Sequence, residues 1–434
     1  MFRWFSRQSP RPSAARKSRR PELEALEDRC VPSLGSPVSV SSSTRLDTGP
    51  ATGSAADPKS GTTYQVVAWS QASNLGDLDV LVKAGVDGNL PSTPQVVANT
   101  GDDEDQADVA VAPNGNYVVV WRQNVNGSNS DIHYTLFSSG GAALITGTIN
   151  QTNGQEFDPH VAMDSQGRFI VAYTAIQQDT FRRSTVVTDN VVAVLFDANG
   201  NQRDIARVAT KANKDEIDPR VDMAPNGRFV ISYFQSDVGA PTSHQSLRSN
   251  SYAITSGTFF KIQLVSRTSV TSQPRRGALI NHDVSITKGG SAVEVYIKQL
   301  KSGTQEIAER KVSFTGGAGG EKLLENTTGA LGVLFGSGLS VGVNDVTGAF
   351  VIAFRAGITS SSHSFVDEFD RRARPLGVPI ELDSVAGSSI GTGDASVSID
   401  DLDDKSAGRL DNYFVAYHTN RNSGDIDAAF GTIS

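Results

Sequence analysis

The stretch DPHVAMDSQGRFIVAYTAIQQDTFRRSTVVTDNVVAVLFDANG, Asp158 to Gly200, contains a short apolar run, a tight turn and a second run that ends in an aromatic. A polar loop, a third run and a further turn follow. Much of it recurs as QADVAVAPNGNYVVVW (106–121) and DPRVDMAPNGRFVISY (218–233). Internal repeats of this length are typical of arrays and ring-shaped folds, so this repeat decides the fold class.

An aromatic residue closes the second run of each repeat and recurs at intervals of about 50 to 60 residues. The series is Trp69, Trp121, Tyr173, Tyr233, Tyr296, Phe354 and Tyr417. Each unit reads as four strands, and the second strand is the most apolar, as in RFIVAY and AFVIAF, which is typical of strands buried on both faces. Asn-Gly and Gln-Gly turns join the first two strands in units two to four. No segment beyond residue 36 has a helical period with caps.

The chain supplies seven third strands but only six fourth strands, because it stops soon after the seventh third strand. The segment PVSVSSST, Pro37–Thr44, can complete the last blade and close a ring. Closure removes two open sheet edges. We therefore expect an all-β, seven-bladed propeller of four-stranded antiparallel blades over residues 36–434. A series of β-sandwiches is the alternative, but sandwich domains need about 100 residues each.

The quoted repeats resemble the β-propeller repeats of secreted bacterial proteins, which read roughly D-P-x-V-A followed by G-x-F-V-V-A-W. The resemblance is clearest over units two to four and implies the fold alone. The WD dipeptide of WD40 repeats and the S-x-D-x-G-x-T-W box of sialidases are absent.

The N-terminal segment, residues 1–35, differs from the rest: its first 20 residues are basic, and it lacks the apolar stretch of an ordinary signal peptide. LEALEDRCVPS, Leu23–Ser33, resembles the LEPR-XLL motif of planctomycete surface and secreted proteins, although Asp28 stands where that motif has proline. The resemblance implies an export or sorting segment and a secreted or cell-surface protein. A plain basic tail is the alternative.

Composition limits the function classes. The net charge of −8 argues against binding to nucleic acid through phosphates, and no apolar run is long enough for a membrane helix. The single cysteine, Cys30, excludes an intrachain disulfide. The six histidines do not occur at zinc-ligand spacing, and no catalytic sequence motif is present. We expect a monomer without a required cofactor.

Acidic residues recur in the inter-blade loops of three successive units. Glu104, Glu156 and Glu216 fall at one aligned position; Gln106, Asp158 and Asp218 fall at another. Because the first strand of a blade lines the channel, we expect these side chains at the channel mouth. They are candidate ligand-binding residues: Glu104, Glu156, Asp158, Glu216 and Asp218. Oxygen ligands of this kind suit Ca²⁺ or cationic groups, and a carboxylate pair suits a glycosidase. Their repetition favours a structural role.

The main functional interpretation is a non-catalytic binding or adhesion module for an extracellular glycan or protein. One alternative is a polysaccharide hydrolase or lyase acting at the channel mouth, which would require an unrepeated cluster of acid, His or Tyr residues; no such cluster was recognised in the sequence. A second alternative is a structural envelope protein without a specific ligand.

Overall fold

The computed structural model describes most of the chain beyond residue 33. The described ranges are 34–41, 45–125, 129–149, 154–181, 184–208, 213–240, 245–255, 257, 260–272, 277–326, 333–334, 338–358, 361–382, 395–400, 411–419 and 425–433. They all belong to one unit, Pro32–Ser434. The motif at Leu23–Ser33 lies outside the described residues, so the export segment stays a prediction.

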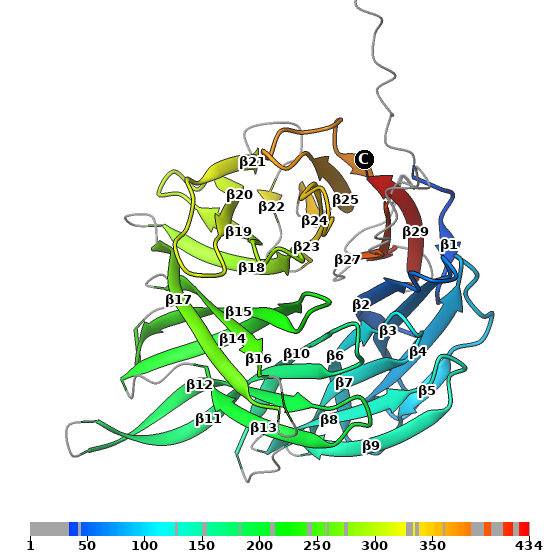
Figure 1. The fold of residues 1–434 in the computed structure, drawn as a ribbon, viewed down its shortest axis with the longest axis horizontal. Coiled ribbons are helices and arrows are strands. Elements are labelled where there is room, and N and C mark those ends of the chain that lie inside the picture. The colour runs from blue at the N-terminus through cyan, green and yellow to red at the C-terminus, as the bar shows by residue number, and fades with distance from the viewer. Residues whose placement is uncertain are drawn as a thin grey trace, which may run out of the picture. The chain divides into compact units, whose positions relative to one another are not determined.

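The described residues form seven antiparallel sheets, the blades of a propeller (Figure 1). Blades one and two are β2 (Asp47–Ala56), β3 (Thr63–Ala72), β4 (Leu78–Val86), β5 (Gln95–Ala98) and β6 (Asp103–Val111), β7 (Tyr117–Asn124), β8 (Ser130–Phe137), β9 (Ala143–Ile149). Blades three and four are β10 (Glu156–Met163), β11 (Phe169–Phe181), β12 (Ser184–Phe196), β13 (Gln202–Arg207) and β14 (Lys214–Met223), β15 (Arg228–Asp237), β16 (Ser246–Ile254), β17 (Ile262–Ser272).

Blade five is β18 (Ala278–Ile286), β19 (Ala292–Gln299), β20 (Gln305–Val312) and β21 (Lys322–Asn326). Blade six is β23 (Ser340–Val343), β24 (Phe350–Ile358), β25 (Ser361–Phe369) and β26 (Ile380–Glu381), with β22 (Val333–Leu334) also paired to β24. Blade seven is β27 (Ala395–Asp400), β28 (Asp411–His418), β29 (Ile426–Ile433) and β1 (Val38–Ser39). The sequence prediction of seven four-stranded blades is confirmed.

The ring closes at blade seven. β1 pairs with β29 through Val38 opposite Ala428 and Ser39 opposite Asp427. The hydroxyl of Ser41 then donates to Asp47 at 2.6 Å and accepts from the backbone N–H of Ile426 at 2.8 Å. One residue therefore joins the last blade to the start of the first, and the predicted closure by an N-terminal strand is confirmed.

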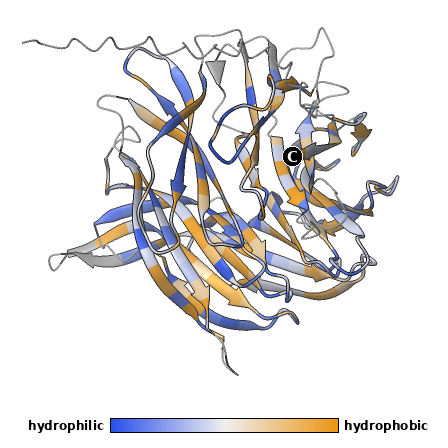
Figure 2. Cartoon of the chain, turned by 45° about the horizontal axis from the view of Figure 1, so that its top comes forward, coloured by the Kyte–Doolittle hydropathy of each residue, from blue (hydrophilic) through white to orange (hydrophobic). Residues whose placement is uncertain are grey.

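Hydrophobic packing between blades builds the core. All seven aromatic residues at the ends of the second strands are buried; Trp69, Tyr173, Tyr296 and Phe354 are completely inaccessible to solvent. Figure 2 shows hydrophobic stretches running along the strands, with hydrophilic stretches common in the connections. Burial of such side chains is the main stabilising contribution in a fold of this kind.

The tight turns have the backbone that their sequences predict. Gly115 in the 113–115 turn has φ 81°, and a Cβ at this position would lie 2.5 Å from the Tyr64 ring. Only glycine satisfies both conditions. None of the described residues lies in a helix, and no helix capable of crossing a membrane is found among them.

A bulge interrupts the inner strand in each of the first four blades. In β6, β10 and β14 the register shifts around Gln106, Asp158 and Asp218, and these three residues have φ between 51° and 56°. The left-handed conformation is unfavourable for residues other than glycine, but Asp tolerates it better than most. The recurring Asp-Pro pair of the sequence is therefore a bulge at the channel wall.

Candidate active site

The inner strands of all seven blades surround a cavity of about 660 Å³. Each inner strand packs against the next, and β27 packs against β2, so the wall is continuous. A cavity of this size is within the usual range for small-molecule sites.

One residue of each inner strand occupies an equivalent position, because it pairs with the residue just before the buried aromatic of the neighbouring strand. We call these residues the inner ring: Ala51, Asp108, His160, Arg220, Asp283, Ser340 and Ser396. All seven line the cavity.

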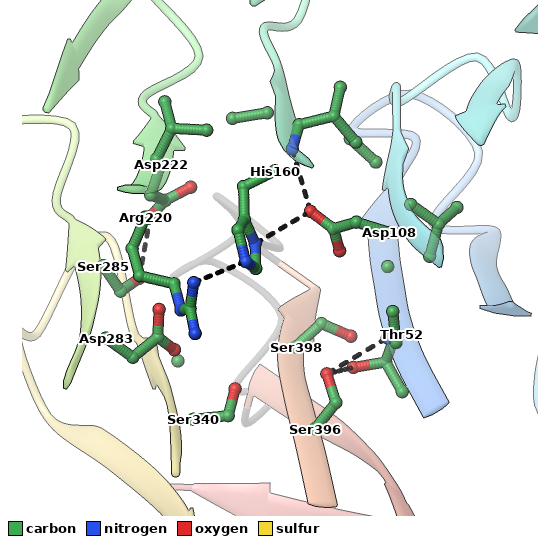
Figure 3. A pocket seen from close by; sticks show the side chains of 18 of the residues that line it. Thr52, Asp108, His160, Arg220, Asp222, Asp283, Ser285, Ser340, Ser396 and Ser398 are labelled. Atoms are coloured by element: carbon green, nitrogen blue, oxygen red, sulfur yellow. Dashed lines mark hydrogen bonds and ion pairs between the residues drawn. The ribbon is translucent and has the colours of Figure 1, made fainter. Parts of the chain in front are cut away.

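Four successive members, Asp108 to Asp283, are charged or titratable and form the charged arc. The hydroxyl arc consists of Ser340, Ser396 and Thr52, the neighbour of Ala51. Figure 3 shows both arcs around the cavity.

Several ring members share a structural role: they accept a hydrogen bond from the backbone of the next blade. Oδ2 of Asp108 accepts from Val161 N at 2.8 Å, and Oδ2 of Asp283 accepts from Val341 N at 2.8 Å. In the hydroxyl arc, Ser396 Oγ accepts from Thr52 N at 3.1 Å. Aspartate and serine therefore perform the same structural task at this position.

The charged arc contains a chain of polar contacts that runs through His160. Arg220 lies 2.7 Å from Nε2 of His160, and Nδ1 of His160 lies 3.2 Å from Oδ2 of Asp108 (Figure 3). Arginine can only donate, so Nε2 accepts this bond, and Nδ1 is the ring nitrogen that lies beside Asp108. Oδ2 of Asp108 thus contacts both Val161 N and Nδ1 of His160, while Oδ1 accepts no hydrogen bond from the described residues.

The carboxylates of the site differ in protonation. Burial raises the pKa of Asp283 to about 6, because the charged form loses water. Burial also raises the pKa of Asp158, and the neighbouring charge of Asp218 adds to this effect. For Asp218, burial is outweighed by Arg220, His282 and His160, so its pKa is lowered.

The residues singled out from the sequence fall into two groups. Gln106, Asp158 and Asp218 line the cavity. The amide Nε2 of Gln106 donates to Oδ1 of Asp158 at 3.0 Å, and its Oε1 accepts from Asp158 N at 2.9 Å. Equivalent bulge residues of adjacent blades therefore contact each other, as the repeat predicted.

The glutamates of the same loops lie elsewhere. Glu104, Glu156 and Glu216 are completely buried and do not line the cavity. Glu104 is bonded to Thr100, and Glu216 accepts from Gln235 at 2.9 Å. The bulge that follows each glutamate interrupts the alternation of the strand. The bulge residues therefore reach the channel and the glutamates do not, which differs from the expected crowding of all five carboxylates at its mouth.

The charged arc was not identified from the sequence. Its members are the first letters of DVAVA, HVAMD, RVDMA and DVSIT, which had been aligned as repeated strands. The available signal was a repeated position whose residue type changes from blade to blade, from Asp to His, Arg and Asp, against a constant apolar background.

Comparisons with known proteins show the fold alone. No family model and no curated protein matches the sequence. Among solved structures, the chain is similar to a protein of unknown function from Dyadobacter fermentans, at 11% identity and a TM-score of 0.49, covering 77% of this chain and 96% of that one. It is similar to the α-L-arabinofuranosidase Arb93A from Fusarium graminearum, at 10% identity and a TM-score of 0.47, covering 75% and 91%. It is also similar to the Hadza microbial sialidase Hz136, at 12% identity and a TM-score of 0.45, covering 85% and 76%.

The interpretation of the chain as a non-catalytic binding or adhesion module is wrong. It had rested on the lack of an unrepeated acid and histidine cluster, and the charged arc is such a cluster, present once in the ring. The alternative, an enzyme acting in the channel, agrees better with these findings.

Proposed function

We propose that the protein is a glycoside hydrolase whose reaction takes place in the channel cavity. The observation that carries the proposal is the charged arc: two carboxylates, Asp108 and Asp283, held in different environments on one side of the cavity. Glycosidases need one protonated and one ionised carboxyl group around the scissile bond. A carboxyl group whose pKa is raised by burial, as for Asp283, supplies the protonated form.

Asp283 is the proposed general acid. Its pKa of about 6 leaves about one tenth of the carboxyl groups protonated at pH 7 and about half at pH 6, so the protonated form can donate to the glycosidic oxygen as the sugar leaves. Both of its oxygens accept backbone N–H groups, from Val284 at 2.9 Å and Val341 at 2.8 Å, which hold the carboxyl group in place.

Asp108 is the proposed ionised partner. Its Oδ2 accepts the Val161 N–H at 2.8 Å and lies 3.2 Å from Nδ1 of His160, and these contacts hold the carboxylate in place. The unbonded Oδ1 is then available to stabilise the positive charge that develops at the anomeric carbon. His160 and Arg220 position this carboxylate without contacting the sugar.

The hydroxyl arc suits a sugar ring. Ser340 and Ser396 offer hydroxyl groups that can both donate and accept, as sugar hydroxyls do. Polar groups that converge in a cavity fix the orientation of a ligand. The same polysaccharide substrate would agree with the export that the N-terminal segment predicts, and secretion remains part of the proposal. Calcium binding by the loop carboxylates also stays a prediction.

The test is the release of new reducing ends from a panel of polysaccharides and aryl glycosides. We expect the wild type to cleave at least one member and D283N to lose that activity. Asp237→Asn is the matched control, because this carboxylate is 69% exposed and lies outside the cavity lining. Unsaturated products would indicate a lyase instead, and no product from any glycan or aryl glycoside would contradict the proposal.

A further inference from the structure

The cavity carries an excess of negative charge. Among the described residues that line it are six aspartates, one arginine and one histidine, and no lysine or glutamate. The aspartates are Asp108, Asp158, Asp164, Asp218, Asp222 and Asp283. Asp164 is paired with Arg168 at 2.5 Å, and among the described lining residues the other five have one arginine, Arg220, to offset them. Burial raises the pKa of Asp283, so this residue, the proposed general acid, adds only part of a negative charge. A ligand that enters this cavity therefore meets a negative potential.

Arg220 is already engaged and cannot easily bind an anion. It pairs with Asp218 at 2.6 Å, donates to His160 at 2.7 Å and donates to the carbonyl of Pro219 at 3.1 Å. The carboxylates of Asp283, Asp158 and Asp108 lie close enough to act on it electrostatically as well. A sugar carboxylate would have to displace one of these partners and would be repelled by the rest.

Asp158 has an acceptor to offer to a ligand. Its Oδ1 is held by Gln106, while Oδ2 accepts no hydrogen bond from the described residues. Burial and the charge of Asp218 raise the pKa of Asp158 by more than the nearby Arg220, His160 and Arg122 lower it, so the ionised form is incompletely stabilised. A bound ammonium group would stabilise it further.

One aspartate of the cavity, Asp222, already has its oxygens occupied, by the Ser285 hydroxyl and by the N–H groups of Ile286 and Met223. Negative charges spread along a channel match a cation with hydrogen-bond donors that are themselves spread out.

We propose that the substrate is a glycan with free amino groups, as in glucosamine oligomers, and that Asp158 binds one of these ammonium groups. Glycans of uronic or sialic acids are excluded by the same charges. This inference rests on the proposed function, because it names the substrate class of the same cavity. It also gives Asp158 and Asp218, two of the residues singled out in the sequence, a part in binding.

The test measures how tightly the wild-type protein binds three trisaccharides: the glucosamine trimer, its N-acetylated form and a trigalacturonate. The first two differ only in their amino groups. We expect the glucosamine trimer to bind about tenfold more tightly than the acetylated trimer at low salt, and the trigalacturonate to bind least. In D158N the ratio of the affinity for the glucosamine trimer to that for the acetylated trimer should fall to about threefold or less. Asp237→Asn should keep it.

The outcomes separate the two proposals. Cleavage of neutral glycans without any preference for the amine would overturn this inference and leave the hydrolase proposal standing. Tight, Asp158-dependent binding of the glucosamine trimer without cleavage of any glycan would overturn the hydrolase proposal and leave the preference for amino groups standing. Trigalacturonate binding as tightly as the glucosamine trimer would overturn the charge argument, and so would a lysine tripeptide that binds as tightly, since the preference would then not be for a saccharide.

Discussion

The two arcs of the inner ring occupy equivalent backbone positions but differ in chemistry. Asp283 in the charged arc and Ser340 and Ser396 in the hydroxyl arc each accept a backbone N–H from the next blade. Serine is sufficient for that structural bond. The charged groups of Asp108, Arg220 and Asp283 therefore exceed what this structural bond needs, and burying charge has a cost in free energy. The difference between the arcs is what the proposed reaction accounts for.

The largest expected contrast between the arcs is in catalysis. We expect D108N and D283N each to lower kcat by about 100- to 10,000-fold, the usual contribution of a general acid or base. S340A, at the equivalent position of the hydroxyl arc, should lower it by about fivefold or less, because a lost sugar hydrogen bond is worth about 1 kcal/mol. Initial rates on the cleaved glycan measure both.

Unfolding temperatures of the same variants provide the control for that contrast. Equal losses of activity in S340A and D108N would show that the two arcs do not differ in function. A loss of folded protein in either aspartate variant would be visible in the same melting curves. The activities are then compared per amount of folded protein.

The second contrast concerns pH and Glu294, a fully buried residue of β19 behind the charged arc. Burial raises the pKa of Glu294 from 4.5 to about 8. The folded state therefore binds more protons than the unfolded state between these values, and the stability from the neutral form, complete below pH 4.5, is lost as the pH rises through about 8.

The variant E294Q should remove this part of the pH dependence. We expect its melting temperature to exceed that of the wild type by several degrees at pH 9, roughly the effect of 1 to 2 kcal/mol, and by much less at pH 5. Melting curves across this pH range are the measurement. An unchanged gap between the two proteins at both pH values would show that Glu294 does not titrate on unfolding.

The smallest expected effect is on stability, and it concerns the hydroxyl arc. Ser396 accepts the Thr52 N–H at 3.1 Å and lies 3.0 Å from the Thr52 hydroxyl, which links blade seven to blade one. S396A should lower the free energy of unfolding by about 1 kcal/mol. Ser398, two residues further along β27, has a buried Oγ without a hydrogen-bond partner among the described residues, so S398A should cost less. Denaturant titrations of both variants compare them, and a larger loss in S398A would refute the assigned link.

Much of the fold could be predicted from the sequence because its signals are local. The aromatic at the end of each second strand, the glycine turns and the missing fourth strand are all visible in the order of residues. Trp121 and Tyr233 are buried as predicted, and Val38 and Ser39 pair with β29. These features follow from the period of the repeat and from the geometry of turns.

The site could be predicted only in part, because two of its causes are not local. The bulge at Gln106, Asp158 and Asp218 decides which side chains reach the channel, and it is visible only once the register is known. The charged arc depends on Asp108 and Arg220 meeting through His160, although they belong to blades that are not adjacent in sequence. Repeated residues stand out in a sequence, whereas a repeated position with changing residues does not.

Chemical rescue of D108A tests the central claim most directly, because it asks whether a carboxylate at this point of the charged arc performs the reaction. A small anion such as azide can occupy the space left by the removed side chain and act at the anomeric carbon in its place. We predict that D108A is nearly inactive, that azide restores its activity severalfold or more, and that azide does not accelerate S340A. Full activity of D108A without azide would contradict the account.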